Sequence, residues 1–154
     1  MSVEKNFLVL IHLQPGMVER APLALIDRVT ELVREYMLLA QPILILELEG
    51  YEATCGWLKA ILADYVKATY LLSELTDGSS DLLQAMNLDA DAAYASIKIE
   101  VGGLYSYACV YDTVAGLASK IKGSEIAVVK SACDNYMADD WGAFERLLGV
   151  SLVA

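Results

Sequence analysis

Cys109 is the residue of this sequence best placed for nucleophilic chemistry. It follows an apolar run that ends at Gly102-Gly103, and after a short turn it opens the next expected helix. The partial positive charge of a helix N-terminus stabilises a thiolate, and backbone N–H groups in such a turn can hold a developing oxyanion. The same spacing also suits a buried cysteine that packs as a small hydrophobic residue.

His12 is the one histidine of the chain and lies at the end of the first expected strand. A histidine beside a cysteine can take the thiol proton, so Cys109 and His12 are candidate nucleophile and base. Glu74 or Glu47 could orient the imidazole ring. The alternatives are a structural histidine with hydrogen bonds to its surroundings and carboxylates that are simply solvated.

The residues around this pair are candidates for substrate binding. They are Gln14, two positions after His12, and the turn before the cysteine, which contains Tyr105, Ser106, Tyr107 and Ala108. The tyrosines either line a substrate pocket or pack a contact between subunits.

Sequence motifs for other chemistries are missing from the chain. The glycines at 102 and 103 lack the third glycine of a dinucleotide-binding loop, and no G-x-S-x-G serine motif occurs. One histidine and three scattered cysteines give no zinc or iron ligand set. We therefore expect neither a cofactor nor a metal.

Strands and helices are expected to alternate along the chain. Short apolar runs indicate strands at 7–12, 43–48, 68–72, 97–101, 125–129 and 150–153. Helical patterns cover 22–39, 55–65, 81–88, 107–121 and, capped by Asp139 and Asp140, a last segment through 148, whereas 89–95 is ambiguous. This order predicts one α/β domain over 1–154, a three-layer α/β/α sandwich with a mostly parallel sheet of about six strands. Sites in such sheets form beyond the carboxyl ends of the strands, here at 12–14, 47–49, 73–77, 102–109 and 131–135.

Composition and charge restrict the partners. The formal net charge of −10 disfavours nucleic acid and anionic membranes. No apolar stretch is long enough to span a membrane, and the first six residues lack a signal-peptide layout, so we expect a cytoplasmic protein with free thiols. Hydrophobic residues make up 56% of the chain, which favours a homo-oligomer that buries part of them between subunits. A core of small residues such as alanine is the alternative.

Four stretches of the sequence resemble one family. The first strand ends in His12, one residue and then Gln14; residues 103–113 contain a glycine, a turn, Cys109-Val110 and then Thr113; residues 126–134 form a strand and a small-residue turn; and residues 143–153 form a final helix and strand. In this order they resemble the isochorismatase-like cysteine hydrolases, whose first strand ends in aspartate, one residue and glutamine.

The resemblance implies a usually oligomeric three-layer α/β sandwich that hydrolyses amides or vinyl ethers of small molecules with an aspartate, a lysine and a cysteine. The cysteine corresponds to Cys109, whereas His12 occupies the place of the aspartate. The region expected to hold the lysine, around 72–80, offers Glu74 instead, and the metal-binding residues of nicotinamidase-type members are missing.

Two main hypotheses follow. In the first, the chain is a divergent hydrolase in which Cys109 attacks, His12 is the base and a carboxylate orients it. In the second, the fold is kept as a non-catalytic binding or assembly subunit. A flavodoxin-like nucleotide or flavin binder is a third hypothesis that rests on fold alone.

Overall fold

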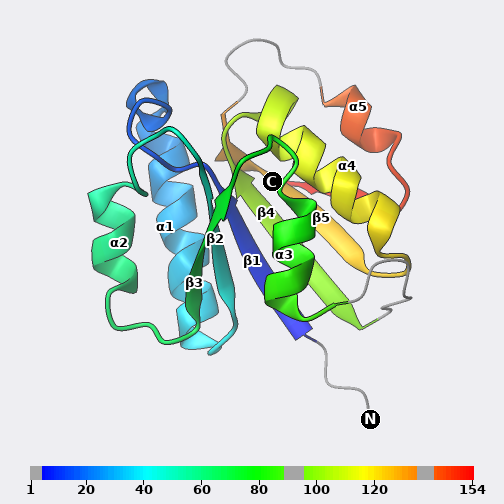
Figure 1. Ribbon diagram of the computed structural model, residues 1–154, viewed down its shortest axis with the longest axis horizontal. Helices are drawn as coiled ribbons and strands as arrows, with labels where there is room; N and C mark the ends of the chain where they lie inside the picture. The colour runs from blue at the N-terminus through cyan, green and yellow to red at the C-terminus, as the bar shows by residue number, and fades with distance from the viewer. Residues whose placement is uncertain (1–4, 89–95, 135–140) are drawn as a thin grey trace.

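A six-stranded parallel sheet forms the centre of the molecule (Figure 1). The computed structural model describes residues 5–88, 96–134 and 141–154. The strands are β1 (Lys5–Ile11), β2 (Ile43–Leu48), β3 (Ala68–Ser73), β4 (Ile97–Gly103), β5 (Glu125–Cys133) and β6 (Val150–Val153). Their order across the sheet is β3-β2-β1-β4-β5-β6, and every neighbouring pair is parallel. All six expected strands are therefore confirmed.

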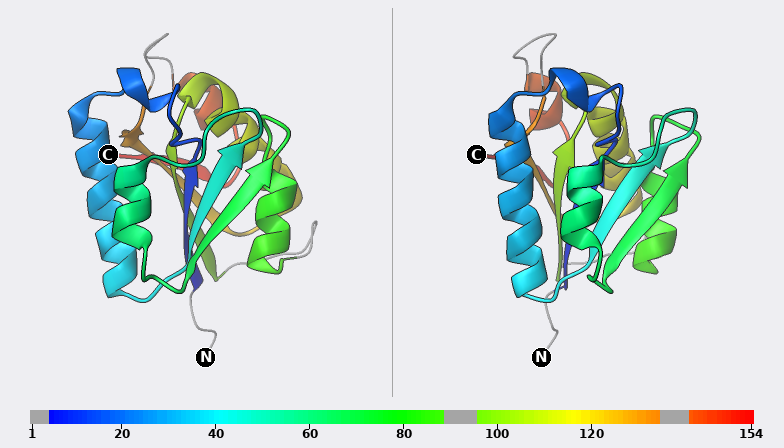
Figure 2. Two further views of the ribbon diagram at one scale, coloured as in Figure 1. Left: turned by 60° about the vertical axis from the view of Figure 1, so that its left-hand side comes forward. Right: turned by 90° about the vertical axis from the view of Figure 1, so that its left-hand side faces the viewer.

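Helices cover both faces of the sheet, which confirms the three-layer fold (Figure 2). The helices are α1 (Leu23–Leu38), α2 (Gly56–Leu62), α3 (Ser79–Met86), α4 (Tyr111–Lys120) and α5 (Gly142–Glu145), with a 3₁₀ turn η1 (Val18–Arg20) and a π turn η2 (Ser106–Val110). Helices α1 and α2 pack on one face and α3, α4 and α5 on the other. No helix of the described residues is long and apolar enough to cross a membrane.

Three expected helices differ from the observed ones. The helix expected from 107 begins as the π turn η2 and becomes α-helical only at Tyr111, and the helix expected over 55–65 ends at Leu62. The last helix is a single turn, Gly142–Glu145. Its expected caps, Asp139 and Asp140, and the ambiguous segment 89–95 lie outside the described residues.

The continuous apolar runs become strands because both of their faces are covered. In β1, Phe7, Val9 and Ile11 join the core cluster beneath α3 and α4, whereas Leu8 and Leu10 join the cluster beneath α1. Because successive side chains of a strand point to opposite faces, alternate residues of β1 pack in the two core clusters on either side of the sheet.

The carboxyl end of β1 is joined closely to β4. Ile11 pairs with Gly103, and the Leu104 N–H donates to the Ile11 carbonyl over 2.9 Å. Gly103 has φ +130°, and a Cβ there would lie 2.2 Å from the Ile11 oxygen. Only glycine fits this position, because the conformation and the contact both exclude a side chain.

Candidate functional site

The segment that carries Cys109 is held between the ends of two strands. Leu104 is bonded to the end of β1, and the Ser106 N–H donates to the Asp134 carbonyl just beyond β5 over 3.2 Å. Residues 104–106 therefore bridge β1 and β5 at the carboxyl edge of the sheet, which is where the strand order predicts a site.

His12 immediately follows β1 at this edge, where it is completely buried. Its φ of 52° lies in the left-handed region, which costs a residue other than glycine about 1–3 kcal/mol. Neither ring nitrogen has a hydrogen-bond partner among the described residues. Burial disfavours the charged imidazolium and lowers the pKa of His12 to about 4, so the ring is neutral near pH 7.

Cys109 lies in η2 and is 8% exposed. Its side chain belongs to the apolar cluster that includes Val110 and Val114. Burial, followed by the negative charge of Asp112, raises the pKa of the thiol, although the backbone N–H of Cys109 partly offsets this. Desolvation thus opposes the thiolate stabilisation expected at a helix start, and that stabilisation stays a prediction.

Cys109 and His12 are not hydrogen-bonded to each other in this structure. Neither imidazole nitrogen has a hydrogen-bond partner in the described part of the chain, so neither is bonded to the Cys109 sulfur. The roles of nucleophile and base therefore stay predictions.

The expected orienting carboxylates lie elsewhere. Glu47 accepts hydrogen bonds from the Thr54 N–H over 2.6 Å and from the Thr54 hydroxyl over 2.8 Å. Glu74 is exposed and lines a polar cavity of about 390 Å³ together with Asp77 and Lys120. Because the His12 nitrogens have no partner among the described residues, neither carboxylate is hydrogen-bonded to the ring.

Gln14 is a structural link between two strand ends. Its buried amide donates to the Leu48 carbonyl (3.1 Å) and the Glu52 carbonyl (2.9 Å), and its oxygen accepts from the Leu48 N–H (2.8 Å). These three bonds occupy the Gln14 amide, and a role for this residue in substrate binding stays a prediction.

The turn expected to bind substrate is held by hydrogen bonds of Tyr105. The Tyr105 hydroxyl donates to the Met17 carbonyl over 3.0 Å. The N–H groups of Ala108 and Val110 both donate to the Tyr105 carbonyl. The backbone N–H of Cys109 interacts with the sulfur of the same residue and lowers its pKa. Tyr107 is part of the same turn by its backbone.

Ser106 was expected only as a residue of the substrate-binding turn. The structure shows in addition that its side chain is buried. The residue is 1% exposed, and its hydroxyl oxygen has no partner among the described residues. An unpaired buried hydroxyl costs about 1–3 kcal/mol, so native proteins retain few of them. Two buried groups at this edge, His12 and Ser106, thus have unused hydrogen-bonding capacity, which no sequence pattern reveals.

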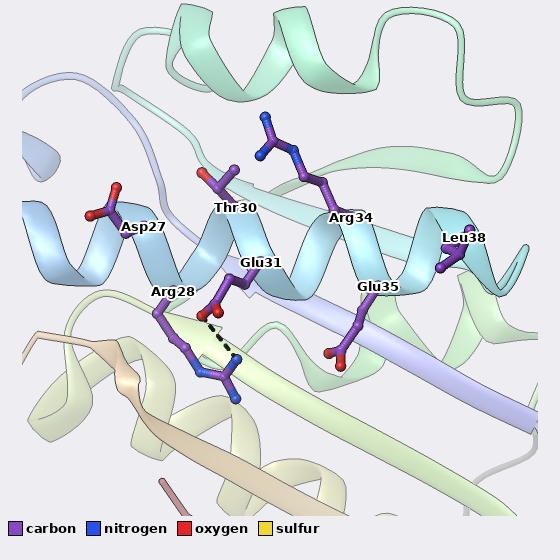
Figure 3. Close-up of a pocket in the computed structure, with 7 residues that line it drawn as sticks. All are labelled: Asp27, Arg28, Thr30, Glu31, Arg34, Glu35 and Leu38. Carbon is purple, nitrogen blue, oxygen red and sulfur yellow. Dashed lines mark hydrogen bonds and ion pairs between the residues drawn. The ribbon is translucent and has the colours of Figure 1, made fainter.

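None of the three described cavities is lined by Cys109 or His12, although the cavity that Glu74 lines also lies at the carboxyl end of a strand, β3. An open groove of about 530 Å³ follows the solvent side of α1, where Arg28 and Glu31 form an ion pair at 3.3 Å (Figure 3). A second cavity, about 480 Å³, lies between the end of α4 and the turn before β6. Within the described ranges, no three His, Cys, Asp or Glu side chains could hold a metal ion.

Comparisons with known proteins concern the fold. No protein-family model and no curated protein matches the sequence. The nicotinamidase SaPncA from Staphylococcus aureus superposes with a TM-score of 0.75 at 13% identity, covering 98% of both chains. The MAR1 ribonuclease from Caenorhabditis elegans gives 0.76 at 16% identity, over 99% of this chain and 79% of that one.

A third structure is the Escherichia coli YcaC gene product, described as an octameric hydrolase of unknown specificity. It has a TM-score of 0.72 at 16% identity and covers 99% of this chain and 78% of its own. One fold thus carries a nicotinamidase, a ribonuclease and an octameric hydrolase, so the fold alone does not determine the activity. The chain has the isochorismatase-like hydrolase fold, and the resemblance seen in its sequence is confirmed at the level of that fold.

Proposed function

We propose that the chain is a divergent cysteine hydrolase that cleaves a small amide, or a related C–N or C–O bond, with Cys109 as nucleophile and His12 as base. The observation that carries this proposal is the state of His12: a fully buried imidazole in a left-handed conformation, with no hydrogen-bond partner in the described part of the chain, where the family has its aspartate. Strain and an unsatisfied polar group together are typical of functional positions.

The proposed reaction has two steps. The Cys109 sulfur attacks the carbonyl carbon while His12 takes the thiol proton, and the C–N bond breaks as His12 passes that proton to the leaving amine. Water then attacks the thioester with His12 as base, which releases the acid and restores the thiol.

Proton transfer should accompany attack. Burial raises the pKa of Cys109 and lowers that of His12 to about 4, so the reaction starts from a neutral thiol and a neutral imidazole near pH 7. Substrate must also bring the two groups into hydrogen-bond reach, which catalytic pairs often achieve only in the bound complex.

Acrylamide and a panel of small primary amides test the proposal. We expect acid release from at least one amide, a single acrylamide adduct mapped to Cys109, and loss of both in Cys109→Ser. His12→Asn should lower the rate of hydrolysis. Cys55→Ser is the matched control, because Cys55 is equally buried but belongs to the opposite core cluster. Turnover that survives Cys109→Ser contradicts the mechanism.

A non-catalytic subunit is the second candidate, and the raised pKa of Cys109 favours it because a buried neutral thiol is a poor nucleophile. Its expectation is a homo-oligomer that neither hydrolyses any amide of the panel nor takes up acrylamide at Cys109. We propose a cytoplasmic location for either candidate, since the three cysteines are free thiols.

A further inference from the structure

Strand β3 forms an open edge of the sheet that lacks the usual protection against pairing. It borders the sheet on the side away from β6 (Figure 2). Its six residues contain no charge and no proline. Apolar side chains are exposed to water within β3, where Tyr70 is 40% and Leu72 63% exposed, and beside it, where Val66 is 93% and Leu75 68% exposed. Long, uncharged, apolar edges of this kind are sites of strand addition.

The backbone groups of this edge point outward in a defined pattern. The Lys67 carbonyl accepts a hydrogen bond from Ile43 of β2, and the Ser73 carbonyl accepts one from Glu49, just beyond β2. Successive residues of a strand present their N–H and C=O groups to opposite sides, so those of Tyr70 and Leu72 face the free edge. Four main-chain groups per chain are thus available to another strand.

We propose that a second copy of this chain binds here, with the two β3 strands antiparallel about a two-fold axis and the two sheets joined into one. A two-fold contact uses the same patch on both subunits. The proposal concerns assembly and does not depend on chemistry at Cys109.

Within the bounds of β3, the hydrogen-bond pattern favours one register. A two-fold axis at Tyr70 would require the Ala68 N–H, which already donates to the Tyr65 carbonyl over 3.2 Å. An axis at Leu71 uses only the outward groups of Tyr70 and Leu72. It places Tyr70 of each copy opposite Leu72 of the other, an aromatic–aliphatic pair of the kind that stabilises adjacent strands. On the other face of the sheet, Leu71 meets its own copy.

Charge at the strand ends agrees with the antiparallel direction. Lys67 precedes β3 and Glu74 follows it, and both are exposed. In the Leu71-centred register, Lys67 of one copy lies opposite Leu75 of the other and one residue from its Glu74, while the Lys67 ammonium also donates to the Ala40 carbonyl of its own chain over 2.7 Å. Opposite charges so placed favour this partner although each chain carries a formal charge of −10.

Disulfide trapping tests the register. Leu71 is a non-hydrogen-bonded pair about the axis, with an expected Cα separation of about 4.5 Å, within the range of a disulfide. Leu71→Cys should therefore give a covalent dimer under mild oxidation. Thr69→Cys is the matched control on the same strand face, because its copy lies four residues away. A disulfide from Tyr70→Cys but not from Leu71→Cys overturns the register.

Charge reversal tests the direction of pairing in solution. Sedimentation should show a dimer of the unmodified chain, and Lys67→Glu and Glu74→Lys should each weaken it. Mixing the two variants should restore dimers, because each contact then joins opposite charges. A monomer over the whole soluble concentration range, or an oligomer that neither reversal affects, overturns the proposal.

Discussion

The buried imidazole of His12 should make the stability of this protein depend on pH. Its pKa is lowered from 6.5 to about 4 in the folded chain, because the charged form would have to be buried. Between these two values the unfolded chain binds a proton that the folded chain does not, so stability falls as the pH is lowered through this window. A shift of about 2.5 units corresponds to roughly 3.4 kcal/mol in full, of which about 2.5 kcal/mol is lost by pH 4.5. Above pH 7 His12 contributes no pH dependence.

Urea unfolding of the wild type and His12→Asn at several pH values isolates this effect. Carboxylates titrate in both proteins, so the difference between their unfolding free energies follows His12 alone. Asparagine is chosen because it tolerates the left-handed conformation at position 12. The difference should move by about 2–3 kcal/mol in favour of the variant between pH 7.5 and 4.5.

Since the chain has one histidine, its imidazole NMR signals give an independent titration. A midpoint near 6.5, or a free-energy difference that is constant with pH, would show that the ring is solvated. The concerted proton transfer proposed above would then lose its basis.

Three further outcomes are expected from the described contacts. Iodoacetamide should label Cys109 slowly at pH 7 and faster as the pH rises, because burial raises the pKa of its thiol. Cys133, whose pKa burial raises to about 12, should react more slowly still. Peptide mapping at successive times measures both rates. Gly103→Ala should lower the free energy of unfolding by at least about 3 kcal/mol or prevent folding, since φ +130° and the Ile11 carbonyl at 2.2 Å oppose a methyl group; circular dichroism during urea unfolding measures this. Gln14→Leu should cost about 2–4 kcal/mol in the same assay, because it removes three hydrogen bonds and leaves backbone groups of Leu48 without partners.

The fold could be predicted because burial on both faces leaves a direct trace in the sequence. The runs beginning at Phe7 and Ile43 have no polar alternation, which is the pattern of central parallel strands. The helical pattern over 22–39 likewise agrees with α1, in which Val29 and Val33 are buried. Segments with short or irregular helices were harder, since the π turn η2 and the single turn of α5 have no hydrophobic period of their own.

The site could be predicted only as a location. The rule that sites form beyond the carboxyl ends of parallel strands placed His12, Ser106 and Cys109 at one edge of the sheet. The hydrogen bonds of Leu104 and Ser106 agree with this placement. It did not show that Gln14 is fully bonded to backbone groups or that Glu47 is bonded to Thr54. Hydrogen-bond partners far apart in the sequence depend on register and loop shape, which local patterns do not encode.

The raised pKa of Cys109, at a position where a helix start suggested a stabilised thiolate, has a general physical origin. A helix start stabilises an anion through dipoles that act over one turn, an effect of about 0.3–1 kcal/mol at exposed positions. Desolvation acts on the whole charge and grows with burial, reaching 3–5 pKa units for fully buried groups. At 8% exposure, with Asp112 adding negative charge, the second effect is larger. A cysteine at this position becomes reactive only if a bound molecule or a base within reach compensates for that burial, and the His12 ring, whose nitrogens have no partner among residues 5–88, 96–134 and 141–154, could be such a base.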